Sequence, residues 1–562
     1  MTHPPKESVS KGALILALGQ ALALWLLHQS IEARVWPATA PGWLFPAYLI
    51  SIFLPLTWLL LWFHRSNRTL WWASAALAAF LAVAGHLAFA DLPSWRPQHN
   101  FDEDRIAGFV LPWAVAWLIA VPLFRARLET GTWHIPYGAL FRSSWRNGLT
   151  LAESVLFTGV FWLLLLLWMA LFSTLGIKFF GNVFTDPRFA YPATTLVFAA
   201  ATQIIGNGDR FIDGVLDQLL GLMKWLLPLA GTIVIVFLLA LLPRLPELIG
   251  HGERIINSSI LLLLVGATLS LFNAAFRDGG ADTGYGHLLQ QGLRVVPPLL
   301  VLIALAALYS MSVRVFDRGL TPSRYWGLMT AVFGLLYSLG YAYASLRSGP
   351  WLAAVKQVNV SVAVILLATL LVSLTPIADP LRLSVASQLK RALTAATAES
   401  RTSALLFLRF DASARGRATL DALVRGEIPA GPAREFAALR AEASEVAART
   451  SRKSSPTVDP DVTPARYARW RASLKVIPEG RTVTPDLEDA IRAHFALAGS
   501  VLDPSDKAPP PQLMFVDLDG DGDPEGLLLA GASRGEPQYL RDFVVFHLVD
   551  GKWSHWSSGD LR

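Results

Sequence analysis

The sequence contains no cysteine and few charged residues. Without cysteine, the chain has no disulfides, thiolate nucleophiles, iron–sulfur clusters or cysteine-ligated zinc. Charged residues make up 16% of the 562 residues and hydrophobic residues 53%, whereas a soluble globular protein carries about 25% charged residues. The deficit lies in residues 1–380, where apolar runs alternate with short polar loops, while residues 381–562 have an ordinary soluble composition. The first two-thirds of the chain is therefore predicted to reside in lipid.

Patterns typical of well-known catalytic or nucleic-acid-binding proteins are scarce. The sequence has no G-x-x-x-x-G-K-[ST] phosphate loop and no H-E-x-x-H zinc motif. The net charge is +6 and the pI about 9.5, but much of the excess lies in short loops between apolar runs. Such loops control membrane insertion and attract anionic lipid. We therefore expect the lipid bilayer as a partner, and no nucleic acid.

Long apolar runs are the dominant feature. A bilayer core of about 30 Å is crossed by roughly 20 apolar residues in a helix, and backbone groups in lipid must be paired within such a helix. The weakest run, near 190–206, is short and contains Gln203, so ten spans with a re-entrant segment remain an alternative to eleven. The runs lie near 12–28, 43–63, 70–90, 107–124, 149–175, 190–206, 218–243, 256–275, 294–314, 325–346 and 358–377.

The predicted fold class is mainly α: a polytopic transmembrane bundle of about eleven helices with a C-terminal soluble α+β region. The expected domains are a transmembrane helical bundle (1–380), a juxtamembrane helical region (381–450), a linker with short helices (451–511) and a small β region with an acidic loop (512–562). In the soluble part, periodicity predicts helices at 384–398, 415–425, 433–448, 464–474 and 484–498, and strands at 512–516, 526–530, 543–549 and 552–556.

Basic residues in short loops predict the orientation. Lys6 and Lys11 precede the first apolar run, which is typical of an uncleaved signal anchor. Arg65 and Arg68 follow the second run and four further arginines follow the fourth, which favours a cytoplasmic N-terminus. An odd number of spans then places the C-terminal region in the periplasm. The basic residues just after the last run favour the opposite side: Arg382, Lys390 and Arg391.

The sharpest local motif is an acidic loop near the C-terminus. Asp517, Asp519 and Asp521 alternate as in the first half of a calcium-binding EF-hand loop, with glycine at the sixth position. The twelfth position is Leu528 instead of glutamate, but Glu525 at the ninth resembles the loops of integrin-type propeller repeats. These four acidic residues are the predicted calcium ligands. The alternative is a solvated Asp-Gly turn between two strands.

Few ionisable residues lie inside the apolar runs. Glu153, Lys224 and His86 each lie near one end of a run, where snorkelling to the interface is favoured over a proton or ion pathway. Asn257 and Asn273 are expected to bridge helices, as are Gln20 and Gln203.

Acidic residues in the outer loops offer a further candidate site. Glu32 and the Asp102–Asp104 cluster fall in loops predicted to be extracytoplasmic. Membrane glycosyltransferases that use lipid-linked sugars place a carboxylate in such a loop as base or metal ligand. The simpler interpretation, which we favour, is an acidic outer loop that complements the basic inner ones.

Several short stretches resemble one bacterial family: Leu175–Phe180, Phe189–Pro192, Trp225–Leu229, Leu271–Gly279, Gly319–Pro322, Pro380–Gln388 and Phe407–Asp411. Together they are similar to the family labelled domain of unknown function 4153 over about residues 140–425, and the loop at 517–525 is similar to the C-terminal ends of its members. The resemblance implies a bacterial membrane protein and no agreed activity, so it implies no catalytic residues.

These features predict a bacterial inner-membrane protein of unknown activity. The leading hypothesis is a non-enzymatic anchor or coupling protein whose soluble C-terminal region binds calcium, with another membrane protein as a further partner. The alternative is an enzyme or transporter that acts on a lipid-linked or amphiphilic substrate, as glycosyltransferases do. Its signature would be a cavity lined by Glu32, Asp102–Asp104, Glu153 or Lys224.

Overall fold

The structure is a computed structural model in which the chain forms two compact units. The first comprises Met1–Ala404 and Ala412–Gly416, and the second comprises Leu405–Asp411 and Arg417–Arg562. Each unit is described separately below. The described residues are 9–92, 103–133, 136–206, 209–244, 257–277, 284–347, 351–428, 433–449, 471–478, 481–498, 511–517, 524–529, 541–549 and 552–561.

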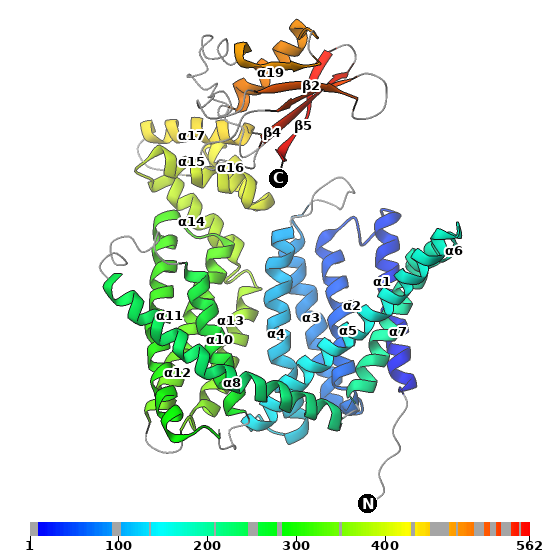
Figure 1. The fold of residues 1–562 in the computed structure, drawn as a ribbon, viewed down its shortest axis with the longest axis vertical. Coiled ribbons are helices and arrows are strands. Elements are labelled where there is room, and N and C mark those ends of the chain that lie inside the picture. The colour runs from blue at the N-terminus through cyan, green and yellow to red at the C-terminus, as the bar shows by residue number, and fades with distance from the viewer. Residues whose placement is uncertain are drawn as a thin grey trace, which may run out of the picture. The chain divides into compact units, whose positions relative to one another are not determined.

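The first unit is built of helices (Figure 1). Within the described residues, eleven of them are long and apolar enough to cross a membrane, which confirms all eleven predicted apolar helices, including the weakest at 190–206. The eleven are α1 (Lys11–Glu32), α2 (Pro41–Leu60), α3 (Arg68–Phe89), α4 (Glu103–Thr130), α5 (Tyr137–Thr174), α7 (Pro187–Gly206), α8 (Asp209–Leu241), α10 (Ser258–Phe276), α11 (His287–Arg318), α12 (Pro322–Leu346) and α13 (Val355–Ser373).

Local sequence signals explain where several of these helices begin. Asn67 and Asn257 accept hydrogen bonds from backbone N–H groups in the first turns of α3 and α10. Thr321 does the same for α12, and Pro322 follows at the first helical position, where the missing N–H costs nothing. Prolines inside α2, α4, α7, α8 and α11 do not end these helices, as is tolerated in apolar helices with close neighbours.

Helix α5 is far more exposed than its neighbours. Only 6% of its most apolar stretch is buried, against 22–44% in the other ten apolar helices. A buried stripe from Tyr137 to Thr158 packs its first half, whereas Leu156, Leu164 and Leu171 are each more than half exposed. Figure 1 shows α5 running obliquely across the unit towards the short helix α6 (Phe179–Thr185).

Two large apolar clusters lie within the first unit. One joins α5, α8 and α10–α13 around buried residues such as Phe272 and Leu300. The other joins α2, α3 and α4 around Phe89, Trp113 and Trp117. Side-chain hydrogen bonds supplement this packing: the indole N–H of Trp117 donates to the Thr57 hydroxyl at 2.8 Å. Such interhelical bonds are the ordinary use of polar residues in apolar bundles.

Short helices follow the last apolar one. The helix expected at 384–398 begins earlier and ends earlier, as α14 (Pro380–Thr394), because Asp379 caps it and Pro380 occupies its first position. The next helix, α15 (Ala398–Leu406), leads into a π-helical segment (Phe407–Asp411) that periodicity did not indicate. The two helices predicted at 415–425 and 433–448 are confirmed as α16 (Ser413–Arg425) and α17 (Ala433–Ala448).

The second unit contains a small sheet near the C-terminus. Strands β2 (Gln512–Val516), β3 (Glu525–Leu529), β4 (Arg541–Val549) and β5 (Lys552–Leu561) form an antiparallel meander, which confirms the four predicted strands. A fifth strand, β1 (Lys475–Ile477), pairs in parallel with β2. It comes from the segment 451–511, which was expected to be a linker with short helices. The helix expected at 464–474 falls mostly outside the described residues.

Helix α19 (Pro485–Ala498) covers the apolar face of this sheet. Its Leu487 and Ile491 are buried against Leu513, Leu528 and Phe546. Thr484 caps the start of α19, since its hydroxyl accepts from the Leu487 N–H at 3.4 Å. Side chains along β2 and β3 point alternately to the two faces of the sheet, so every second residue lies on this face. This pattern specifies the register, in which Val516 pairs with Glu525.

Candidate functional site

The predicted calcium ligands lie where the β2–β3 hairpin opens. Val516 pairs with Glu525, so Asp517 and Glu525 are brought to the same end of the two strands. Glu525 is buried, with 4% of its surface exposed. Asp519 and Asp521 fall in 518–523, outside the described residues. Among the described residues no group of three or more metal-ligating side chains gathers, so the calcium site stays a prediction.

The ionisable residues of the apolar helices occupy different settings. His86 Nδ1 lies 3.0 Å from the Gly42 carbonyl oxygen, and its ring packs on Trp43, so it joins α3 to α2. The ammonium of Lys224 lies 5.4 and 5.1 Å from the ring centroids of Trp225 and Tyr285, as cation–π contacts. Glu153 is half-buried on α5. Within the described residues, these three side chains do not meet in one site.

Tyr285, beside Lys224, is held as a neutral hydrogen-bond donor. Its hydroxyl donates to the Lys224 carbonyl oxygen at 2.5 Å. Burial raises the pKa of Tyr285 to about 12, because an ionised phenolate would lose its hydration there. The pair therefore ties the loop before α11 to α8 through a donor that stays protonated at neutral pH.

Arg105, which follows the acidic cluster at the start of α4, forms an ion pair. The Arg105 guanidinium contacts the Asp91 carboxylate, 2.5 Å away, and the Ala88 carbonyl oxygen. Asp102 lies outside the described residues, as do the side chains of Glu103 and Asp104. Arg105 thus ties the start of α4 to the end of α3, which is a structural role.

A closed polar network lies inside the largest apolar cluster. The Asn273 amide donates to the hydroxyls of Tyr137 and Tyr341, at 3.2 and 3.4 Å. The Asn359 amide donates to Tyr137 at 2.9 Å and its carbonyl accepts from Tyr341 at 3.0 Å. These four residues, the tyrosine–asparagine network, join α5, α10, α12 and α13. Asn273 therefore bridges helices as predicted, whereas Asn257 caps α10 instead.

A second polar cluster holds α14 against the corner between α11 and α12. The carbonyl oxygen of Arg318 accepts from Gln388 at 2.9 Å, from Arg391 at 3.1 Å and from Arg324 at 2.9 Å. The Leu320 N–H donates to the Ser387 hydroxyl at 2.9 Å. We call these contacts the α14 clamp. They join two of the stretches on which the family resemblance rests, Gly319–Pro322 and Pro380–Gln388.

Arg391 belongs to a basic neighbourhood at this clamp. Burial, reinforced by the charge of Arg318, lowers the pKa of its guanidinium, yet the group remains charged at neutral pH because an arginine titrates far above 7. At the beginning of α14, Arg415 contacts the carboxylate of the capping residue Asp379 at 2.6 Å. Charged groups therefore lie at both ends of α14.

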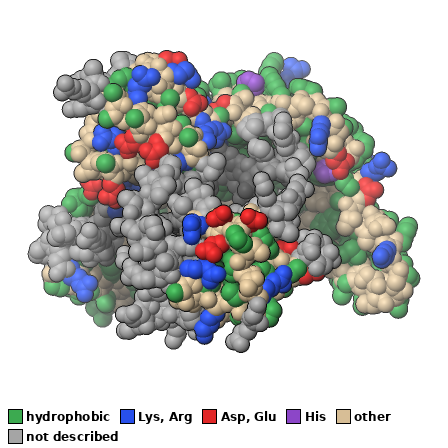
Figure 2. All heavy atoms as spheres, turned by 90° about the horizontal axis from the view of Figure 1, so that it is seen from above, with side chains coloured by type: hydrophobic (Ala, Val, Ile, Leu, Met, Phe, Trp, Pro, Cys, Tyr) green, Lys and Arg blue, Asp and Glu red, His purple; other side chains and the backbone are tan. Residues whose placement is uncertain are grey.

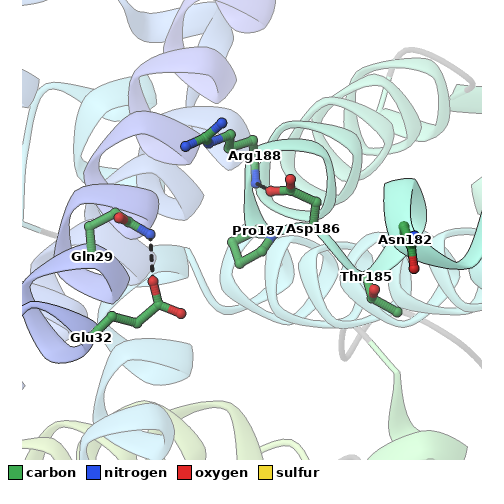
Figure 3. Close-up of a pocket in the computed structure, with 7 residues that line it drawn as sticks. All are labelled: Gln29, Glu32, Asn182, Thr185, Asp186, Pro187 and Arg188. Atoms are coloured by element: carbon green, nitrogen blue, oxygen red, sulfur yellow. Dashed lines mark hydrogen bonds between the residues drawn. The ribbon is translucent and has the colours of Figure 1, made fainter.

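Among the described residues, a cavity lies between the end of α1 and the junction of α6 with α7. It is an open hollow with a volume of about 480 Å³, in the range of about 300–1,000 Å³ that small-molecule pockets occupy. We call it the α1–α7 hollow. Figure 3 shows its lining: Gln29, Glu32, Asn182, Thr185, Asp186, Pro187 and Arg188.

The two sides of the α1–α7 hollow carry different groups. On α1, the Glu32 carboxylate accepts from the Gln29 amide at 2.8 Å and lies 3.3 Å from His28 Nε2, while 56% of its side chain stays exposed. On the other side, Asp186 accepts from the backbone N–H of Arg188 at 2.8 Å. In Figure 3 the Arg188 side chain extends towards α1. Glu32 is thus the one carboxylate of the alternative hypothesis that lines a described cavity.

Aromatic packing fixes the walls below this hollow. The rings of His28 on α1 and Tyr191 on α7 meet edge to face at 5.7 Å. Beside them, Trp168 and Phe172 of α5 pack against Phe180 of α6, at 5.2 and 4.6 Å. The hollow was not predictable as a unit, because Glu32 and Asp186 lie more than 150 residues apart.

One motif was missed by sequence reasoning. Gly531-Ala-Ser533-Arg-Gly535 fits the G-x-S-x-G pattern of the nucleophile elbow, which requires a strand, a sharp turn and a helix. Strand β3 precedes it and strand β4 follows it, and the motif itself lies outside the described residues. It therefore carries no assignment.

On the face seen in Figure 2, no single kind of charged side chain dominates among the described residues. In the view of Figure 2, acidic and basic side chains intermingle, as on an ordinary hydrated surface.

Comparison with known proteins found no matching family model, no similar curated protein and no similar solved structure.

Proposed function

We propose that this chain is a multi-pass integral membrane protein whose eleven apolar helices span a bilayer. The carrying observation is the exposed surface of α5, whose most apolar stretch is only 6% buried and includes the exposed residues Leu156, Leu164 and Leu171. In water, this surface would cost roughly 25 cal/mol for each Å² exposed. A lipid environment removes that cost, and the tyrosine–asparagine network pairs polar groups inside the bundle with one another.

Fractionation tests this proposal directly. The full-length protein should remain in the membrane pellet after washing at alkaline pH and should require detergent for extraction. Peripheral proteins leave the membrane under the same wash and serve as the control. Recovery of the folded protein in the detergent-free supernatant would contradict the proposal.

Within that frame, the leading function is that of a bacterial inner-membrane anchor or coupling protein. The N-terminus would be cytoplasmic, the C-terminal region periplasmic, and another membrane protein a partner. The α14 clamp supports this role, because it attaches the segment that follows the last apolar helix to the α11–α12 corner by several hydrogen bonds. The contact between Gly319–Pro322 and Pro380–Gln388 fits the proposed membership of the 4153 family.

A second candidate is an enzyme or transporter for a lipid-linked or amphiphilic substrate. The α1–α7 hollow favours it, since Glu32 and Asp186 offer two carboxylates in an open polar cavity at a helix end. Its test is complementation of a deletion strain by Glu32→Ala and Asp186→Ala variants that reach wild-type abundance. Full complementation by both would remove this candidate and leave the anchoring role.

A further inference from the structure

The α1–α7 hollow combines charges of both signs with neighbouring apolar surface. Arg188 supplies one guanidinium, while Glu32 and Asp186 supply two carboxylates. An anionic headgroup alone would meet more negative than positive charge. A headgroup that carries both a phosphate and an amine would find a partner for each charge.

The apolar surface beside the hollow supplies a place for acyl chains. Leu167, Leu171 and Leu175, along and just after the end of α5, are 56%, 57% and 72% exposed, and Phe179 of α6 is 65% exposed. The aromatic cluster of Trp168, Phe172 and Phe180 fixes α6 beside this surface. A polar cavity at the end of an exposed apolar helix is the arrangement that an amphiphile requires, since its headgroup and chains seek different surroundings.

The hydrogen-bonding groups of the hollow favour a primary amine. Besides the two carboxylates, Gln29 and Asn182 offer amide oxygens, and Thr185 offers a hydroxyl. An ammonium has three N–H donors for such acceptors, whereas a trimethylated amine has none. In Figure 3, Glu32 comes from α1, whereas Asp186 and Arg188 come from the start of α7. A headgroup in the hollow would therefore lie between these two walls.

We infer that the α1–α7 hollow binds the zwitterionic headgroup of an aminophospholipid of the phosphatidylethanolamine type. Arg188 pairs with the phosphate, Glu32 and Asp186 accept hydrogen bonds from the amine, and the acyl chains lie along α5. This inference rests on the proposed membrane insertion and names the amphiphile class of the second candidate function.

The test measures which lipid the full-length protein retains. The protein is purified in mild detergent, offered phosphatidylethanolamine, phosphatidylcholine or phosphatidylglycerol, and analysed by native mass spectrometry. We expect about tenfold higher retention of the ethanolamine lipid than of the other two, because hydrogen bonds to charged groups contribute that much or more. Soluble glycerophosphoethanolamine should compete weakly, since it lacks the chains that α5 would hold.

Matched variants separate the site from general effects. Glu32→Gln and Arg188→Gln should each lower retention of the ethanolamine lipid about tenfold, while Arg188→Lys should keep part of it. Glu399→Gln and Lys390→Gln make the same charge changes at exposed positions outside the hollow and should leave retention unchanged. A thermal unfolding curve for each variant identifies any that fails to fold.

Three outcomes would overturn the inference: equal retention of all three lipids, preference for the anionic lipid, or hollow variants that behave as the controls do. Strong competition by the soluble headgroup would mean that a free phosphorylated amine, and not a lipid, occupies the hollow. If alkaline washing leaves the protein in the membrane while any of these results appears, the headgroup inference fails and the proposed membrane insertion stands.

Discussion

At the residue scale, the tyrosine–asparagine network places four polar side chains in an apolar interior. Tyr341 and Tyr137 are 2% and 8% exposed, and Asn359 is 8% exposed. A buried polar group without a partner is costly, whereas one that is fully paired costs little. The closed arrangement therefore fixes how α5, α10, α12 and α13 meet, because any relative shift would separate donors from acceptors.

Tyr341→Phe tests this network with almost no change of volume. It removes the hydroxyl that joins Asn273 and Asn359, and we expect a loss of about 1–3 kcal/mol of stability, measured as a lower unfolding temperature in detergent. Tyr343→Phe on the same helix is the control, since Tyr343 is 57% exposed and is not a member of the network. Equal unfolding temperatures for the two variants would show that the network contributes nothing.

The acidic loop gives the second prediction at this scale. If Asp517, Asp519, Asp521 and Glu525 hold calcium, titration into the full-length protein should release heat, with a Kd on the order of 10⁻⁴–10⁻³ M, as in extracellular calcium modules. Asp519→Asn together with Asp521→Asn should abolish the signal, whereas Asp489→Asn on α19 should not. Absence of heat at millimolar calcium in the wild-type protein would leave the solvated-turn alternative.

At the element scale, α12 and α13 approach each other through a glycine. A Cβ atom built on Gly340 would lie 2.3 Å from Val358 Cγ1, closer than non-bonded carbons can approach. Gly340→Ala should therefore force the two helices apart and cost about 1–3 kcal/mol. Gly266→Ala on α10 is the control, because nothing lies within 4 Å of its added Cβ. A stabilised Gly340→Ala protein would contradict this packing.

The α14 clamp is testable by the same approach. Gln388, which is 2% exposed, donates to the carbonyl oxygens of Arg318 and Leu320. Gln388→Leu removes both bonds and leaves the two carbonyl oxygens with fewer donors, so we expect a loss of about 1–3 kcal/mol and faster proteolysis after residue 380. Gln357→Leu, at an exposed position of α13, should have little effect on either measurement.

The apolar helices were predictable because each needs only local information. A run of about 20 apolar residues specifies a helix wherever the chain places it. Other elements depend on distant partners: β1 is three residues long and is defined by its pairing with β2. The π-helical segment at Phe407–Asp411 likewise has no signature in periodicity.

The candidate sites were harder to predict than the helices. Glu32 and Asn273 were singled out from sequence, but their partners were not. Asn359 and Tyr137 are 222 residues apart, and Asp186 and Arg188 meet Glu32 only because α7 packs against α1. The sequence indicated which polar residues are unusual for their position in or beside an apolar run. The fold determined which of these residues contact one another.

At the scale of the whole molecule, the parity of the helices determines the side of each end. Eleven crossings from a cytoplasmic N-terminus would put Arg562 in the periplasm. A periplasm-dependent reporter fused after Arg562 should be active, and the same reporter fused after Gly131, beyond four crossings, should be inactive. Reporters on the same side at both positions would mean that one of the seven helices between them does not cross, with α7 the first suspect.

The shared oxygen of the α14 clamp has a mechanical consequence. Three donors on separate side chains converge on the Arg318 carbonyl oxygen. A movement of the α11–α12 corner that breaks one of these hydrogen bonds would therefore also distort the other two. A torque applied to α14 would then rotate α11 and α12 together with it, and the connection between them would not bend. A load borne by the residues after Ser384 would in this way reach the interior of the helical unit.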